Sequence, residues 1–150
     1  MKVKYGTSLD IESWMQLVQH VRWNFPGLET AAALDDHRKT VLRFMSENRA
    51  LCVKDAEKVV GVLLLSKKHN MICCLAVTPE YRRNGIASAL LEKALTELDR
   101  TKDITVTTFQ ENDDKGMAPR ALYKNIGFVE EKLMIENDYP VQRFVLRGRL

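Results

Sequence analysis

Apolar residues recur along this chain with two spacings, which separate the predicted helices from the predicted strands. Where they recur every three or four residues, they mark one face of an amphipathic helix. In the clearest case this face carries Ile86, Ala87, Leu90, Leu91, Ala94, Leu95 and Leu98. The spacing predicts four helices, over residues 10–23, 35–48, 84–99 and 118–125. Asp10 is predicted to cap the first helix, and Asp35 or Asp36 is predicted to open the second.

Short apolar runs between turn residues predict seven strands. They cover residues 2–5, 50–53, 59–66, 71–77, 104–109, 128–135 and 141–147. The three strands between residues 50 and 77 are predicted to be antiparallel, because short polar turns at 55–57 and 68–70 join them. The resulting order is β-α-α-β-β-β-α-β-α-β-β, which is neither doubly wound nor all-parallel.

Length and composition limit the classes of protein that the chain can belong to. The 150 residues suit a single domain, residues 1–150, and a hydrophobic content of 45% suffices for one core. The net charge of +3 is too small and too dispersed to indicate nucleic acid as a partner. No segment resembles a signal peptide or is long enough to span a membrane. We therefore expect a cytoplasmic protein without membrane attachment.

The three cysteines are Cys52, Cys73 and Cys74. The adjacent pair points to opposite faces of a predicted strand, so it suits neither a disulfide nor a metal site. We interpret the cysteines as small core residues and expect a reducing compartment and no bound metal.

The turn between the predicted strand 71–77 and the following helix has the character of an anion site. It contains Arg82, Arg83, Asn84 and Gly85. The first backbone N–H groups of a helix lack partners within it, and the helix dipole adds partial positive charge there. Gly85 lets the backbone approach a diphosphate closely. Because the chain has neither a P-loop nor a GxGxxG motif, another phosphate-bearing cofactor is predicted, held mainly by main chain.

Two motifs resemble those of the GCN5-related N-acetyltransferases (GNAT). Arg82-x-x-Gly85-x-Ala87 resembles motif A, in which Arg or Gln precedes a glycine by three residues and Gly or Ala follows it by two. An apolar strand and a proline precede this motif, as in the family. Downstream, residues 121–128, Ala-Leu-Tyr-Lys-Asn-Ile-Gly-Phe, resemble motif B, L-Y-x-x-x-G-F. The two motifs also occur in the family's order.

This resemblance implies the GNAT acyl-CoA N-acyltransferase fold. That fold is an α/β (α+β) architecture with a mixed, mostly antiparallel central sheet of about seven strands, flanked by about four helices. It also implies an acyltransferase that moves an acetyl group from acetyl-CoA to a primary amine by direct attack. The competing interpretation is a non-catalytic acetyl-CoA or CoA-binding sensor or partner module. A nucleic-acid-binding module is disfavoured, because no aromatic platform accompanies the two arginines of motif A.

In the family, the strand before motif A separates from its neighbour. Its free backbone groups bind the pantetheine arm and the thioester carbonyl, and the N–H groups of the loop hold the pyrophosphate. The resemblance therefore assigns cofactor binding to Leu75, Ala76, Val77, Arg82, Arg83, Asn84, Gly85, Ile86, Ala87 and Ser88. It also places Lys124 near the outer part of the coenzyme, unless that side chain is simply solvated.

The chain departs from the family before motif B. Gly116 and Pro119 stand where many members have the Asn and Ala of N-x-x-A-x-x-L-Y. The asparagine that binds pantetheine is therefore missing, and Asn112 in the same loop is the candidate replacement.

Tyr123 falls on the family's tyrosine that lies near the CoA sulfur and acts as general acid for the thiolate. The alternative is a packing role, with the ring in the core and the hydroxyl at its rim. Many members also carry a glutamate base before motif A, where this chain has Cys73 and Cys74. The base is therefore unassigned.

Three carboxylates in the loop before motif B are candidates for this base: Glu111, Asp113 and Asp114. The alternative is that they form a solvated, charged loop.

The family fold places the first two helices and their connection at the acceptor site. Trp23 and Phe25 are predicted to bind the acceptor there, with core packing as the alternative. The expected acceptor is a small-molecule or peptide amine, and the family analogy allows a homodimer.

Overall fold

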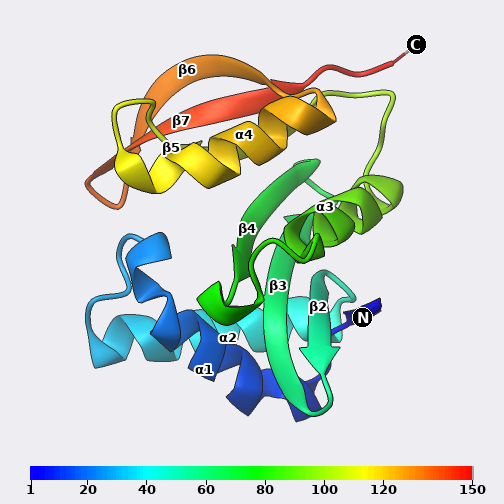
Figure 1. Ribbon diagram of the computed structural model, residues 1–150, viewed down its shortest axis with the longest axis vertical. Helices are drawn as coiled ribbons and strands as arrows, with labels where there is room; N and C mark the ends of the chain where they lie inside the picture. The colour runs from blue at the N-terminus through cyan, green and yellow to red at the C-terminus, as the bar shows by residue number, and fades with distance from the viewer. Residues whose placement is uncertain (150) are drawn as a thin grey trace.

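The computed structural model describes residues 1–149, which form one seven-stranded sheet with helices on both faces (Figure 1). The sheet has the order β1-β2-β3-β4-β5-β7-β6, and all neighbours are antiparallel except β4 and β5. The strands are β1 Val3–Tyr5, β2 Ala50–Asp55, β3 Lys58–Ser66, β4 Met71–Val77, β5 Ile104–Phe109, β6 Val129–Glu136 and β7 Tyr139–Leu146. The predicted mixed, mostly antiparallel sheet is confirmed, and every predicted strand end lies within two residues of the observed one.

The four α-helices of residues 1–149 are α1 Ile11–His20, α2 Ala31–Ser46, α3 Ile86–Glu97 and α4 Met117–Ile126. The predicted start of α2 at Asp35 or Asp36 was wrong. The helix begins at Ala31 because the Thr30 side chain accepts a hydrogen bond from the Ala33 N–H at 3.0 Å. The predicted first helix also ends earlier, at His20, and a short 3-10 turn, η2, covers Arg22–Asn24.

Two apolar cores lie on opposite faces of the sheet. One joins α1 and α2 to side chains of β2 and β3, with Trp14, Val18 and Val41 fully buried. The other joins α3 and α4 to the opposite face, with Leu90, Leu91 and Phe144 fully buried. Since helices cover both faces of the central strand β3, every residue of that strand after Lys58 is buried.

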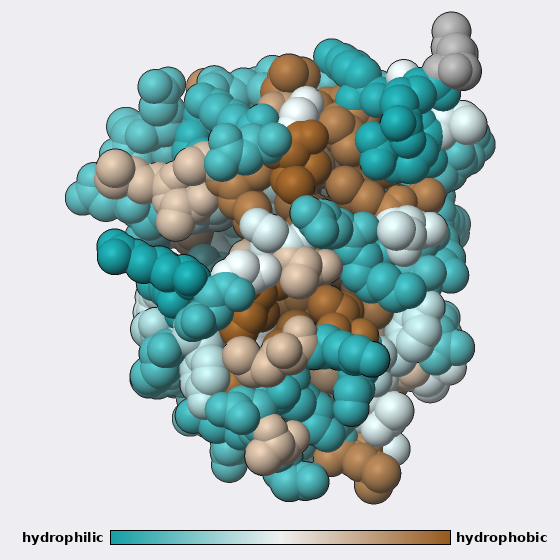
Figure 2. Space-filling model, turned by 45° about the vertical axis from the view of Figure 1, so that its right-hand side comes forward, coloured by the Kyte–Doolittle hydropathy of each residue, from teal (hydrophilic) through white to brown (hydrophobic). Residues whose placement is uncertain are grey.

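The outer surface is mainly polar. The face shown in Figure 2 is largely hydrophilic, and its apolar side chains gather near the middle. Leu133 and Ile135 of the edge strand β6 are among the exposed large apolar side chains. Within residues 1–149, no helix combines the length and the apolar character needed to cross a membrane.

The sheet opens between β4 and β5. Only Met71 and Thr105 are paired, at the start of these two strands. Beyond this point β4 continues beside β3 while β5 continues beside β7, so the two halves of the sheet diverge (Figure 1). This divergence places the C-terminal half of β4 next to an open cleft.

Candidate functional site

Two cavities occupy the cleft between the halves of the sheet. The loop cavity, of about 490 Å³, lies beside the loop that precedes α3. The inner cavity, of about 330 Å³, lies between α2 and strands β5 and β7. Both are lined by Asn24, Leu75, Pro119 and Tyr123. The two cavities are therefore neighbours, with these four residues between them.

Strand β4 presents free backbone groups to this site. The Thr78 N–H donates to the Val60 carbonyl at 2.9 Å, which fixes how β4 pairs with β3. Because the backbone groups of successive strand residues point to opposite sides, those of Ala76 face β3. Those of Leu75 and Val77 point away from β3 into the cleft. The strand separation that the family resemblance implied is thus present.

The loop before α3 has the backbone geometry of an anion cradle. Gly85 is the N-cap of α3 with φ of +72°, and Arg83 has φ of +68°, so both are left-handed. A Cβ atom at Gly85 would meet no atom within 4 Å, so the space in front of the helix is open. The Asn84 side chain donates to the Tyr81 carbonyl at 2.9 Å and holds the loop in this shape. Successive N–H groups in such a turn form a concave nest for an anion.

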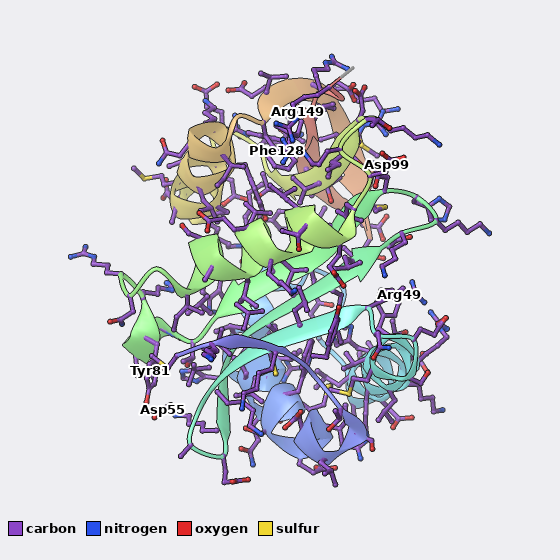
Figure 3. The ribbon with its side chains drawn as sticks, turned by 90° about the vertical axis from the view of Figure 1, so that its right-hand side faces the viewer. Arg49, Asp55, Tyr81, Asp99, Phe128 and Arg149 are labelled. Carbon is purple, nitrogen blue, oxygen red and sulfur yellow. The ribbon has the colours of Figure 1, made fainter. Side chains whose placement is uncertain are left out.

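Tyr81 anchors the start of this loop. Its hydroxyl donates a hydrogen bond to the carboxylate of Asp55 at the end of β2. Figure 3 shows the two residues together near the N-terminal end of α3. This contact ties the loop to the end of β2.

Every charged residue that lines the loop cavity is a cation. Arg82, Arg83 and Lys115 contribute to its walls, and none of its lining residues is Asp or Glu. The Arg82 guanidinium lies 5.4 Å from the centroid of the Trp23 ring. The Lys115 ammonium donates to the Tyr139 hydroxyl at 2.9 Å. Sequence analysis did not identify Lys115, whose position depends on how the loop before α4 folds back.

Tyr123 lies where the two cavities meet. It is 4% exposed, and its ring centroid lies 5.7 Å from that of Phe128 and 6.1 Å from that of Phe144. Burial, with a smaller effect from the nearby Cys74 thiol, raises the pKa of the phenol above its usual value. The phenol is therefore protonated at neutral pH, and the ring packs in the core while lining both cavities.

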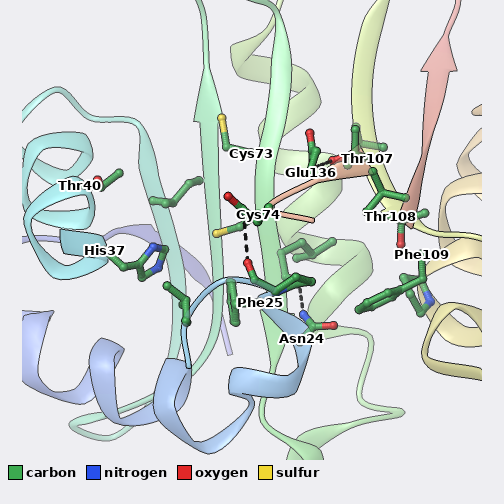
Figure 4. A pocket seen from close by; sticks show the side chains of 18 of the residues that line it. Asn24, Phe25, His37, Thr40, Cys73, Cys74, Thr107, Thr108, Phe109 and Glu136 are labelled. Carbon is green, nitrogen blue, oxygen red and sulfur yellow. Dashed lines mark hydrogen bonds between the residues drawn. The ribbon is translucent and has the colours of Figure 1, made fainter. Parts of the chain in front are cut away.

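The inner cavity is lined by an imidazole and a carboxylate that sequence analysis missed, those of His37 and Glu136 (Figure 4). The Nε2 atom of His37 is buried and has no hydrogen-bond partner among residues 1–149. Burial lowers the pKa of this imidazole, so it is neutral at pH 7. The Glu136 carboxylate accepts a hydrogen bond from the Thr107 hydroxyl at 3.0 Å. The spacing of His37 with Val41 and Phe44 on one helix face was the only sequence signal for either residue.

Most of the predicted cofactor residues line the loop cavity: Leu75, Ala76, Val77, Arg82, Arg83, Gly85, Ile86, Ala87 and Ser88. Asn112 and Lys124 line neither cavity. Asn112 is exposed, and the Lys124 ammonium pairs with the Glu130 carboxylate at 2.5 Å. The Asn84 side chain instead stabilises the loop before α3 through its hydrogen bond to the Tyr81 carbonyl.

The three carboxylates considered as base, Glu111, Asp113 and Asp114, also lie outside both cavities. The Asp113 carboxylate accepts hydrogen bonds from the Lys115 backbone N–H at 3.1 Å and the Tyr139 hydroxyl at 2.5 Å. It therefore shapes the loop before α4.

The two aromatic residues expected at the acceptor site lie in different places. Trp23 is 42% exposed and lines the loop cavity, beside Arg82. Phe25 is 9% exposed, belongs to the core beneath α1 and α2, and also lines the inner cavity. Phe25 thus both packs in the core and lines the inner cavity.

Because the Phe25 ring is part of this core, we expect Phe25→Ala to lower the free energy of unfolding by about 3 kcal/mol or more. Phe25→Leu keeps much of the apolar volume and should cost clearly less. Urea unfolding of both variants measures the difference. Wild-type stability of Phe25→Ala would show that the ring contributes little to the core.

Comparisons with known proteins agree with the fold. A family model described as "Acetyltransferase (GNAT) domain" matches residues 46–130, more than half of the chain. No curated protein is significantly similar to the chain in sequence.

Solved structures match over nearly the whole length. A GNAT-family acetyltransferase from Bacillus cereus ATCC 10987 is 19% identical with a TM-score of 0.73, over 99% of this chain and 98% of that one. Ard1 from Thermoplasma volcanium is 20% identical with a TM-score of 0.74, over 99% and 98%. The PaiA N-acetyltransferase from Thermoplasma acidophilum, solved in complex with coenzyme A, is 13% identical with a TM-score of 0.69, over 95% and 96%. At these identities the likeness shows a shared fold.

Proposed function

The chain belongs to the GNAT family of acetyltransferases, and from this premise we propose that it transfers the acetyl group of acetyl-CoA to a primary amine. The observation that carries the proposal is the pair of cavities that meet at Leu75 and Tyr123. A protein that only binds the coenzyme needs the loop cavity, whereas transfer also needs a joined space for an acceptor. The inner cavity supplies that space.

The loop cavity suits the diphosphate of acetyl-CoA. The backbone N–H groups of residues 83–88 surround the start of α3, where the helix dipole favours an anion. The open space at Gly85 leaves room for phosphate oxygens against the main chain. Arg82, Arg83 and Lys115 add positive charge, and no Asp or Glu lines this cavity.

The free backbone groups of β4 suit the rest of the coenzyme. The N–H group of Leu75 and the N–H and C=O groups of Val77 can pair with the pantetheine amides in the manner of an added strand. An N–H here can also donate to the thioester carbonyl oxygen as negative charge develops on it. The Asn24 amide, which donates to the Leu75 carbonyl at 3.4 Å, lies at the same junction.

We assign Tyr123 the role of general acid. Transfer breaks the carbon–sulfur bond and forms a carbon–nitrogen bond, so the departing sulfur gains a proton and the amine loses one. Burial keeps the phenol protonated, and the same burial raises the proton affinity of a thiolate beside it. Tyr123 can therefore donate its proton as the bond breaks and regain one from water.

We further propose that the amine attacks the thioester directly. Cys73 and Cys74 are the alternative carriers of the acetyl group, because both line the inner cavity. Burial raises the pKa of the Cys73 thiol to about 11 and that of the Cys74 thiol to about 12, so both are protonated at neutral pH and weak nucleophiles. The proton of the amine has two candidate acceptors in the same cavity, the His37 imidazole and the Glu136 carboxylate.

The direct test is to incubate the enzyme with acetyl-CoA and graded concentrations of primary amines. We expect release of the free CoA thiol to rise with amine concentration and to match the amount of acetylated amine found by mass spectrometry. Tight binding of acetyl-CoA with no amine-dependent thiol release would favour the non-catalytic alternative.

A further inference from the structure

The charged side chains along the cleft are separated by sign. The loop cavity is lined by three cations and no carboxylate. The inner cavity is lined by one carboxylate, that of Glu136, and by no Lys or Arg. Because the cavities are neighbours, a polyanionic coenzyme and a cationic acceptor can each enter the one that suits its charge. An acceptor that carries its own carboxylate would meet Glu136 unfavourably.

A contact between two distant segments lies at the edge of the inner cavity. The Asn137 side chain, in the β6–β7 turn, donates to the Pro26 carbonyl at 3.3 Å. A Cβ atom on Gly27 would lie only 3.2 Å from the Asn137 side chain, so the two segments are in close contact. Both Pro26 and Asn137 line the cavity. The connection between α1 and α2 thus meets the β6–β7 turn across the cleft.

The size and the walls of the inner cavity indicate a compact ligand. Its volume of about 330 Å³ is near the lower end of the range for small-molecule sites. Phe25, Leu28, Phe109 and Val141 form apolar walls. The buried His37 Nε2, which lacks a partner within residues 1–149, leaves one hydrogen bond for a ligand to satisfy.

We propose that the acceptor is a compact primary amine with an apolar body, bound in the inner cavity, and that Glu136 at its exposed edge selects it by its positive charge. This inference rests on the proposed acetyl transfer. It narrows the acceptor to small molecules without a carboxylate and excludes the N-terminus of a protein chain as the preferred acceptor.

The test uses matched sets of three acceptors. Each set contains an amino acid, the amine that remains when its carboxylate is removed, and a hexapeptide that begins with that amino acid. Suitable sets start from 2-phenylethylamine, 3-methylbutylamine, 1,4-diaminobutane and 1,5-diaminopentane. We expect at least one amine to be acetylated with a kcat/KM about tenfold or more above those of its amino acid and its peptide.

Glu136→Gln tests how this selection arises. The variant should raise the KM for the preferred amine about tenfold and narrow the gap between amine and amino acid, while the Kd for acetyl-CoA stays unchanged. Asp138→Asn is the matched control, because it neutralises a neighbouring exposed carboxylate that does not line the cavity. Asp138 has φ of +61°, a conformation that asparagine also tolerates, and this variant should behave as wild type.

The outcomes separate this inference from the proposed function. Acetylation of a peptide or an amino acid as fast as its amine, or an unchanged KM in Glu136→Gln, would overturn the inference and leave acetyl transfer standing. Binding of acetyl-CoA without acetylation of any amine, amino acid or peptide would overturn the proposed function, and this inference with it.

Discussion

Gly85→Asp should lower the affinity for acetyl-CoA by about a hundredfold or more, whereas Gly85→Asn should lower it far less. Gly85 lies at the N-terminus of α3 with φ of +72°, facing open space. An aspartate there would place negative charge where the pyrophosphate is proposed to bind, and close like charges cost several kcal/mol. Asparagine has nearly the same shape and tolerates the same backbone conformation. A difference in affinity between the two variants therefore reports the negative charge and not backbone strain.

Calorimetric titration of both variants with acetyl-CoA measures this effect. The two variants should have similar melting temperatures, because no neighbouring atom lies within 4 Å of a Cβ atom at this position. If the two variants bind acetyl-CoA equally well, the loop before α3 does not hold the pyrophosphate.

Tyr123→Phe should lower kcat by about a hundredfold or more, which is within the range for loss of a general acid. The Kd for acetyl-CoA should change little, because the ring keeps its contacts with Phe128 and Phe144. Since burial raises the pKa of the phenol, the wild-type enzyme should keep this donor protonated throughout the range from pH 6 to about pH 10. No alkaline loss of rate from Tyr123 is therefore expected in that range.

Tyr5→Phe is the matched control for this variant. The Tyr5 hydroxyl bonds to the Glu97 carboxylate, and Tyr5 lines neither cavity, so its loss should leave kcat unchanged. Steady-state rates and acetyl-CoA titrations of both variants test whether Tyr123 acts as the general acid. Wild-type turnover in Tyr123→Phe would show that Tyr123 has only a packing role.

The part of the loop cavity formed by residues 75–88 could be predicted from the sequence because these residues are contiguous. A strand, a basic turn with Gly85, and a helix follow one another in the chain, so local rules for strands, turns and helix N-termini apply directly. Element positions were predicted well where apolar spacing was unambiguous. The start of α2 was missed because Thr30 caps the helix ahead of two equally plausible aspartates.

The inner cavity could not be predicted in the same way. His37 and Glu136 lie on α2 and β6 and come together only through the folded sheet. No local pattern marks a carboxylate at the end of a strand as a pocket residue. The contact between Pro26 and Asn137 likewise joins segments that are far apart in the sequence. Phe25 was ambiguous because one ring both packs in the core and lines the cavity.

A crystal structure of the acetyl-CoA complex tests the central claim most directly. We expect the pyrophosphate on the backbone N–H groups of residues 83–88, the pantetheine arm along Leu75 and Val77, and the sulfur within hydrogen-bond reach of the Tyr123 hydroxyl. The acetyl group should point into the inner cavity. A coenzyme bound outside the loop cavity, or one whose sulfur lies away from Tyr123, would contradict the account.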